Sequence, residues 1–280
     1  MIVNNAFRTR VQSPPSPPNL IKLDSGSWLF FMGVIDLLFP ISCLECGKGE
    51  GYICNDCLSK IPKAKLFCVE CHRSSIDGAT HTKCRKVRSI DFAYSSWDYS
   101  GVVRKAILKL KYNFAYKIAE ELAEKFVEKV KRDVPILPKE AILVPIPLYK
   151  LRENWRGFNQ AEELGKMTAK KMGWVYEPDL LIRNKKTTPQ TELKGKERSS
   201  NLLGAFSIKK GYELREYGVC GKGFEANKLK NDPHNSFSTI HNSCVILFDD
   251  VLTTGSTLKE ACKVLKRKGV KNVWGLTIAA

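Results

Sequence analysis

The sequence predicts an α/β protein, with a mostly parallel, twisted sheet flanked by helices, preceded by a small zinc-ribbon domain. After about residue 89, short apolar runs alternate with amphipathic helical patterns. That alternation is typical of a parallel sheet covered on both faces. Before it, seven of the ten cysteines lie between Cys43 and Cys84. A segment with so few core residues needs another source of stability, and paired cysteines provide it by binding a metal ion.

The length of 280 residues allows one large core with a small accessory domain. Residues 1–31, with "SPPSPP" at 13–18, are expected to be a disordered extension. We predict the zinc ribbon over residues 32–88 and the α/β domain over 89–280. The polar stretch at about 209–242 is far longer than a usual connection and is predicted to be an insertion. Met32 is a second candidate for the initiating methionine.

The formal net charge of +17 favours polyanionic partners, either nucleic acid or phosphorylated ligands. A basic, solvated surface without such a partner is the alternative. The longest apolar run, residues 28–40, carries Asp36 and is shorter than the roughly 20 residues that span a bilayer. It also lacks the features of a secretory leader. We therefore expect no transmembrane segment and a cytoplasmic location, which includes peripheral attachment at the inner membrane.

The spacing of apolar residues predicts the individual elements. Residues 90–101 alternate as a strand or hairpin that ends at a glycine, and 103–130 show the three-to-four period of one long or two consecutive helices. Residues 141–147 form a short buried-strand run stopped by two prolines. Beyond these we expect a helix at 160–172, strands at 204–208 and 244–248, a helix at 255–269 and a strand at 272–279.

Four ligand pairs predict two metal sites. Three are Cys-x-x-Cys pairs, at 43–46, 54–57 and 68–71, and the fourth is "HTKC" at 81–84. Two intervening residues let both donors face one tetrahedral zinc. The simplest grouping is Cys43, Cys46, Cys54 and Cys57 for one site, and Cys68, Cys71, His81 and Cys84 for the other. Crossed pairing, and His72 in place of His81, remain alternatives. Four protein ligands leave no open position, so these sites are expected to be structural, and the ribbon could also serve as a docking or nucleic-acid surface.

The strand "CVILF" runs into Asp249 and Asp250, then into a threonine-, serine- and glycine-rich loop before a helix. In open α/β sheets ligands bind beyond the carboxyl ends of the strands. Backbone N–H groups and hydroxyls at a helix start make a cradle for phosphate. Two adjacent carboxylates would repel each other in a bare core, so we expect them to accept hydrogen bonds from sugar hydroxyls. A simple helix cap by Thr254 or Ser256 is the alternative.

These residues carry a resemblance. "ILFDDVLTTGST" resembles the phosphoribosyl-pyrophosphate (PRPP) signature of type I phosphoribosyltransferases. Residues 143–173 and 181–206, together with the cysteine pairs, resemble the ComF family of competence proteins over roughly 32–208 and 243–279. The resemblance implies a type I phosphoribosyltransferase fold, PRPP bound with Mg²⁺, and structural Zn²⁺. The chain departs from the family in its long 209–242 segment and in His81, which stands where the family has a cysteine.

The resemblance also implies roles by position. Asp249 and Asp250 would be the catalytic pair that meets the ribose. The further PRPP-binding candidates are Thr253, Thr254, Gly255, Ser256, Thr257, Arg156, Pro145 and Lys111, with Pro145 in the pyrophosphate loop. The nucleic-acid candidates are Lys109, Lys111, Arg183 and Arg198, and Thr188, Gln190 and Asn201 also match the family pattern.

The implied function is a PRPP-binding role in natural competence, in which the protein handles incoming single-stranded DNA in the cytoplasm. Other competence proteins, such as a DNA-uptake helicase, would be partners. Two alternatives fit the same motif: a phosphoribosyltransferase with an unidentified nitrogen acceptor, and a regulator that senses PRPP. The sequence contains no recognisable base pocket, so it leaves catalysis undecided.

Overall fold

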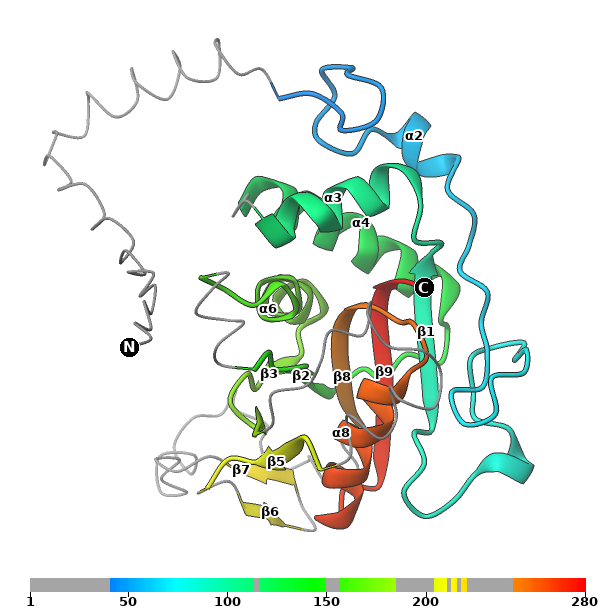
Figure 1. The fold of residues 1–280 in the computed structure, drawn as a ribbon, viewed down its shortest axis with the longest axis vertical. Coiled ribbons are helices and arrows are strands. Elements are labelled where there is room, and N and C mark those ends of the chain that lie inside the picture. The colour runs from blue at the N-terminus through cyan, green and yellow to red at the C-terminus, as the bar shows by residue number, and fades with distance from the viewer. Residues whose placement is uncertain are drawn as a thin grey trace, which may run out of the picture. The chain divides into compact units, whose positions relative to one another are not determined.

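A computed structural model describes residues 41–112, 116–149, 157–184, 204–210, 213–215, 218–220 and 244–280 (Figure 1). The chain divides into two compact units, Met1–Ile41 and Ser42–Ala280. The predicted disordered extension lies outside the described residues. No helix within the described part of the chain combines the length and the apolarity needed to cross a membrane.

A five-stranded parallel sheet forms the centre of the second unit, in the order β1-β9-β8-β2-β3. The strands are β1 (Phe92–Trp97), β2 (Ala141–Pro145), β3 (Val175–Tyr176), β8 (Cys244–Val251) and β9 (Asn272–Ala279). β8 is the middle strand, and its first five residues are buried. The mostly parallel sheet flanked by helices confirms the predicted fold class.

Helices cover both faces of this sheet (Figure 1). The helices are α3 (Gly101–Tyr112), α4 (Tyr116–Asp133), α6 (Gln160–Met172) and α8 (Ser256–Arg267). Ile246 and Phe248 of β8 join the core beneath α3, α4 and α6. Val245 and Leu247 join the core beneath α8. Alternate side chains of β8 therefore point into the two cores on opposite faces of the sheet. This explains why its first five residues are all apolar.

The structure decides between alternatives that the sequence left open. The 90–101 pattern forms the single edge strand β1 rather than a hairpin, and the 103–130 pattern forms two helices rather than one. The predicted strand at 204–208 appears as β5 (Phe206–Ile208), which pairs antiparallel with β4 (Leu181–Arg183) in a separate small sheet. Within the predicted insertion, β6 (Glu213–Arg215) and β7 (Gly218–Cys220) form an antiparallel pair.

The cysteine segment, residues 42–88, packs on the first edge of the sheet and on α4. Isolated antiparallel bridges join Lys63 to Trp97 and Ala79 to Phe92, which covers the edge of β1. Glu121 of α4 accepts hydrogen bonds from the backbone N–H groups of Tyr52 at 2.7 Å and Ile53 at 3.0 Å. These carboxylate contacts fix the loop that leads into Cys54.

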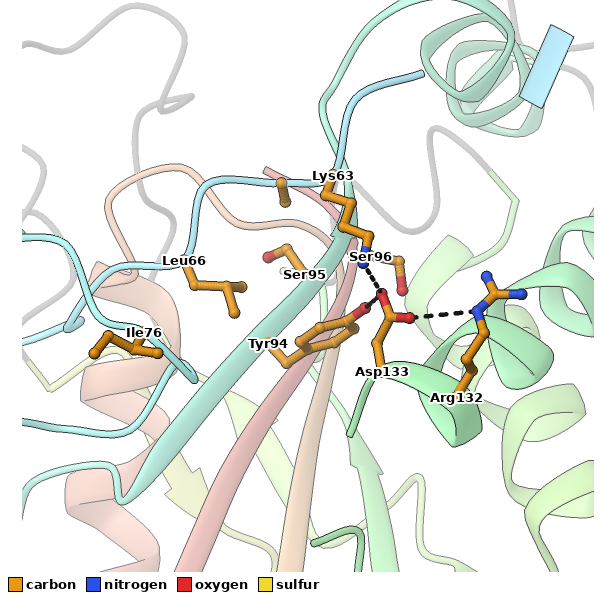
Figure 2. Close-up of a pocket in the computed structure, with 9 residues that line it drawn as sticks. Lys63, Leu66, Ile76, Tyr94, Ser95, Ser96, Arg132 and Asp133 are labelled. Carbon is orange, nitrogen blue, oxygen red and sulfur yellow. Dashed lines mark hydrogen bonds and ion pairs between the residues drawn. The ribbon is translucent and has the colours of Figure 1, made fainter. Parts of the chain in front are cut away.

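Asp133, the last residue of α4, makes a second contact between this helix and the cysteine segment (Figure 2). Its carboxylate accepts hydrogen bonds from Tyr94 at 3.0 Å and Lys129 at 2.7 Å, and it forms an ion pair with Lys63 of the cysteine segment at 3.7 Å. An open pocket of about 540 Å³ lies beside the Asp133 carboxylate, and Leu66, Ile76 and Ser95 are among the residues that line it. Burial raises the pKa of Asp133, but the bonds from Lys129 and Tyr94 outweigh burial and hold the pKa below its ordinary value.

We predict that Asp133→Asn lowers the free energy of unfolding by roughly 1–3 kcal/mol at neutral pH, because the buried Lys129 ammonium loses its charged acceptor. A depressed carboxyl pKa gives stability that is present above about pH 4 and is lost as the pH falls through the folded-state value. Denaturant unfolding from pH 7 to pH 2.5 should therefore show a smaller loss in the variant than in the wild type. The control Glu128→Gln removes an exposed carboxylate from the same helix. Equal pH dependence of Asp133→Asn and the wild type would contradict the assignment.

Candidate functional site

The first group of metal-ligand side chains contains Cys43, Cys46, Cys54 and Cys57, whose sulfur atoms all lie within 4.8 Å of one another. The sulfurs of Cys46 and Cys54 are 3.6 Å apart. Four thiolates about 2.3 Å from one tetrahedral ion would be about 3.8 Å apart, so the donor set fits a zinc-type ion. Cys54 is also the N-cap of the short helix α2 (Asn55–Ser59), which directs Cys57 back toward the group.

The second group contains Cys68, Cys71, His81 and Cys84, again within 4.8 Å of one another. The Cys71 sulfur is 3.4 Å from His81 Nδ1. His81 Nε2 lies 3.1 Å from the carbonyl of Ser74 and donates to it in the tautomer that frees Nδ1 for a metal. His72 lies outside this group, and its ring stacks on Phe67 at 5.8 Å. The structure thus forms the simplest of the predicted groupings.

The thiols differ in how readily they ionise. Burial raises the pKa of Cys43, but the backbone hydrogen bonds from Cys46 and Cys54 lower it to about 6. A backbone hydrogen bond from Arg73 is the main cause that lowers the pKa of Cys71 to about 6. Burial raises the pKa of Cys57 to about 12. The Cys43 and Cys71 thiols therefore ionise more readily than an ordinary cysteine, and a bound cation would favour loss of the remaining protons of each group.

The predicted phosphate loop lies at the carboxyl end of β8. Asp249 and Asp250 are half-buried, and the backbone N–H of Asp250 donates to the Asp249 carboxylate at 2.9 Å. Gly255 is the N-cap of α8, in the left-handed region with φ 68°, and it provides no side-chain cap. Thr254 lies one residue before this N-cap, and its hydroxyl accepts a long hydrogen bond of 3.5 Å from the backbone N–H of Ser256. The hydroxyls of Thr254 and Ser256 are hydrogen-bonded to each other at 2.8 Å.

The neighbouring strand β2 ends beside this loop. Pro145 is the register partner of Phe248, the residue before Asp249. The backbone N–H of Ile146 donates to the Phe248 carbonyl at 2.8 Å. The "VPIP" segment and the two aspartates therefore share one edge of the sheet, as ligand-binding segments of open α/β sheets do.

The remaining predicted residues are distributed as follows. Lys109 is exposed on α3, and Lys111 follows it in the same helix. Arg183, in β4, lies over the Phe206 ring with its guanidinium 5.5 Å from the ring centroid. Arg156, Thr188, Gln190, Arg198 and Asn201 lie outside the described residues.

Sequence reasoning missed the contact between the second ligand group and the phosphate loop. Val69 lies between two ligands, is 1% exposed, and fills the space beside Gly255. A Cβ built on Gly255 would come within 2.5 Å of Val69 Cγ1. No local pattern signals this contact, since the two residues belong to segments far apart in the chain.

The chain is similar to three kinds of curated protein. It is 35% identical to competence protein F of Haemophilus influenzae over 158 residues, which cover 55% of this chain and 56% of that protein. It is 26% identical to competence protein ComFC of Bacillus subtilis, over 79% of this chain and 81% of the relative. It is 24% identical to DNA utilization protein YhgH of Escherichia coli, over 86% and 98%.

The chain spans little more than half the length of the first of these relatives, and no protein-family model matches it. The similarity to the other two extends over most of both chains. These similarities support the resemblance to the ComF family of competence proteins.

Proposed function

We propose that this chain is a PRPP-binding protein that acts in natural competence and handles incoming single-stranded DNA in the cytoplasm. The relatives' names, competence protein and DNA utilization protein, support the cellular role. The observation that best supports PRPP as the ligand is the sequence of features at the end of β8. A carboxylate pair is followed there by a hydroxyl-rich loop and by a helix whose N-cap is a glycine in the left-handed region.

Each part of this site suits one part of PRPP. A helix N-terminus offers backbone N–H groups and a positive dipole end to the 5-phosphate, and the hydroxyls of Thr254 and Ser256 lie in the same loop. The carboxylates of Asp249 and Asp250 are suited to accept hydrogen bonds from the two ribose hydroxyls. Mg²⁺ bound with PRPP would neutralise the pyrophosphate. The backbone N–H of Ile146 is hydrogen-bonded to the Phe248 carbonyl, so "VPIP" lies next to Asp249, which supports a role for this segment in contacting the pyrophosphate.

We assign structural Zn²⁺ to the two ligand groups. Four sulfur donors, or three sulfurs and one imidazole nitrogen, are the ligand sets of structural zinc sites, and both groups are closed, without a position for substrate. The cysteine segment packs on the sheet edge through backbone and carboxylate contacts. The metal sites therefore serve the fold rather than the chemistry.

A second function, phosphoribosyl transfer to a nitrogen acceptor, is favoured by the carboxylate pair. Two half-buried aspartates beside a ribose would stabilise positive charge at its reacting carbon as pyrophosphate departs. Pyrophosphate release from PRPP across a panel of bases and amines separates the functions. Turnover with any acceptor establishes the transferase, whereas binding without turnover is the behaviour of a carrier or a PRPP-sensing regulator.

We expect Asp250→Asn and Thr254→Ala each to weaken PRPP binding roughly 10-fold or more, because each removes a hydrogen-bond partner of the ligand. Titration calorimetry with Mg²⁺ measures this. The matched control is Asp98→Asn, which removes a carboxylate just after β1, another parallel strand of the same sheet. Unchanged affinity in both loop variants would overturn the site.

For DNA, we expect a labelled single strand to bind at low salt, with log affinity falling linearly as log salt rises. Lys109→Ala should weaken binding and reduce the salt slope by about one, because this exposed lysine on α3 would lose a phosphate contact. Lys139→Ala, an exposed lysine before β2, is the control. Fluorescence anisotropy follows both. Absence of binding at low salt would remove the DNA role and leave phosphoribosyl transfer as the better account.

A further inference from the structure

The two Cys-x-x-Cys knuckles at 43–46 and 68–71 have nearly the same sequence, "CLEC" and "CVEC", and in each the glutamate forms an ion pair with a lysine of a helix. In the first, Glu45 forms an ion pair with Lys105 at 3.2 Å. Lys105 is the fourth residue after Gly101, which begins α3 with φ 44°. The first knuckle therefore lies against the start of α3.

The second knuckle repeats this arrangement at the phosphate loop. Glu70 forms an ion pair with Lys259 at 3.7 Å, and Lys259 Nζ also donates to the backbone carbonyl of Glu70 at 3.3 Å. Lys259 is the fourth residue after Gly255, which begins α8 with φ 68°. The backbone N–H of Lys259 donates to the Gly255 carbonyl at 2.9 Å. The same lysine thus joins the knuckle to the first turn of α8.

Val69 provides the apolar half of this contact. Its side chain is buried in the core that also contains Leu252 and Leu258, the residues on either side of the loop. A Cβ on Gly255 would come within 2.5 Å of Val69 Cγ1, so the valine side chain packs directly against the backbone of the loop. The loop is thus confined between the sheet on one side and the second knuckle on the other.

Metal binding would fix the conformation of this knuckle. Val69 and Glu70 lie between Cys68 and Cys71, so a metal held by both sulfurs determines where the two intervening side chains point. The binding energy of a structural metal is folding energy for the segment that it closes. A phosphate-binding loop gains affinity when its N–H groups are held in place before the ligand arrives. The metal and the phosphate would therefore favour the same arrangement of the knuckle and loop.

We propose that the second knuckle positions the phosphate loop, so that metal at Cys68, Cys71, His81 and Cys84 and a phosphate ligand at residues 253–257 strengthen each other's binding. Val69 and Glu70 are the positioning residues. This inference rests on the proposed PRPP site. Linkage requires the coupling to be reciprocal, since each ligand changes the affinity for the other by the same factor.

The first test is Val69→Ala in the full chain, with PRPP and Mg²⁺ in a calorimeter. We expect affinity to fall roughly 5-fold to 20-fold while the metal content, measured by mass spectrometry, stays at the wild-type level. The matched control is Leu44→Ala, the same position in the first knuckle, which should leave PRPP affinity unchanged.

The second test uses the wild type and needs no variant. A chromogenic chelator removes metal with and without PRPP and Mg²⁺. We expect PRPP to slow the release from one of the two metal sites roughly 5-fold or more and to leave the other unchanged. Wild type that binds PRPP, together with unchanged affinity of Val69→Ala or unchanged release from both sites, would overturn this inference alone. Wild type that binds no PRPP would overturn the proposed function and this inference with it.

Discussion

The structure depends on the burial of one strand at the centre of a parallel sheet. β8 has neighbours on both sides, and its first five residues supply both cores, so its register is set by packing. Burial ends at Phe248, and the next two residues are aspartates. Because parallel strands all end at the same edge, this change from apolar to charged residues puts the aspartates, the phosphate loop and "VPIP" together. The position of the candidate site therefore follows from the end of the buried part of β8 at Phe248.

The cysteine segment extends this arrangement. It contacts the sheet domain through buried apolar residues such as Ile53 and Val69, and through charged and backbone groups that include Glu121 and Asp133 of α4. Its two knuckles occupy equivalent positions at two helix starts, and one of these is the phosphate loop. The second knuckle therefore contacts the candidate phosphate loop directly, through the residues between its candidate metal ligands.

Local spacing was sufficient to predict the two ligand groups, the helical pattern at 103–130 and the strand, loop and helix around Asp249, because each depends on residues close together in the chain. Contacts between distant segments were not predictable in this way. The bonds from Tyr52 and Ile53 to Glu121 join residues 69 and 68 positions apart. β3 has two residues and no period to detect, and β5 looks like a sheet strand but pairs outside the main sheet.

Hydrogen–deuterium exchange of the full chain, with and without PRPP and Mg²⁺, tests most directly whether the end of β8 and the second knuckle form one site. The account predicts that PRPP slows exchange in peptides that cover residues 249–257 and in those that cover 68–72. Peptides that cover the first knuckle, residues 43–47, should exchange at the same rate in both conditions. Protection that stops at the loop, or that reaches both knuckles equally, would contradict it.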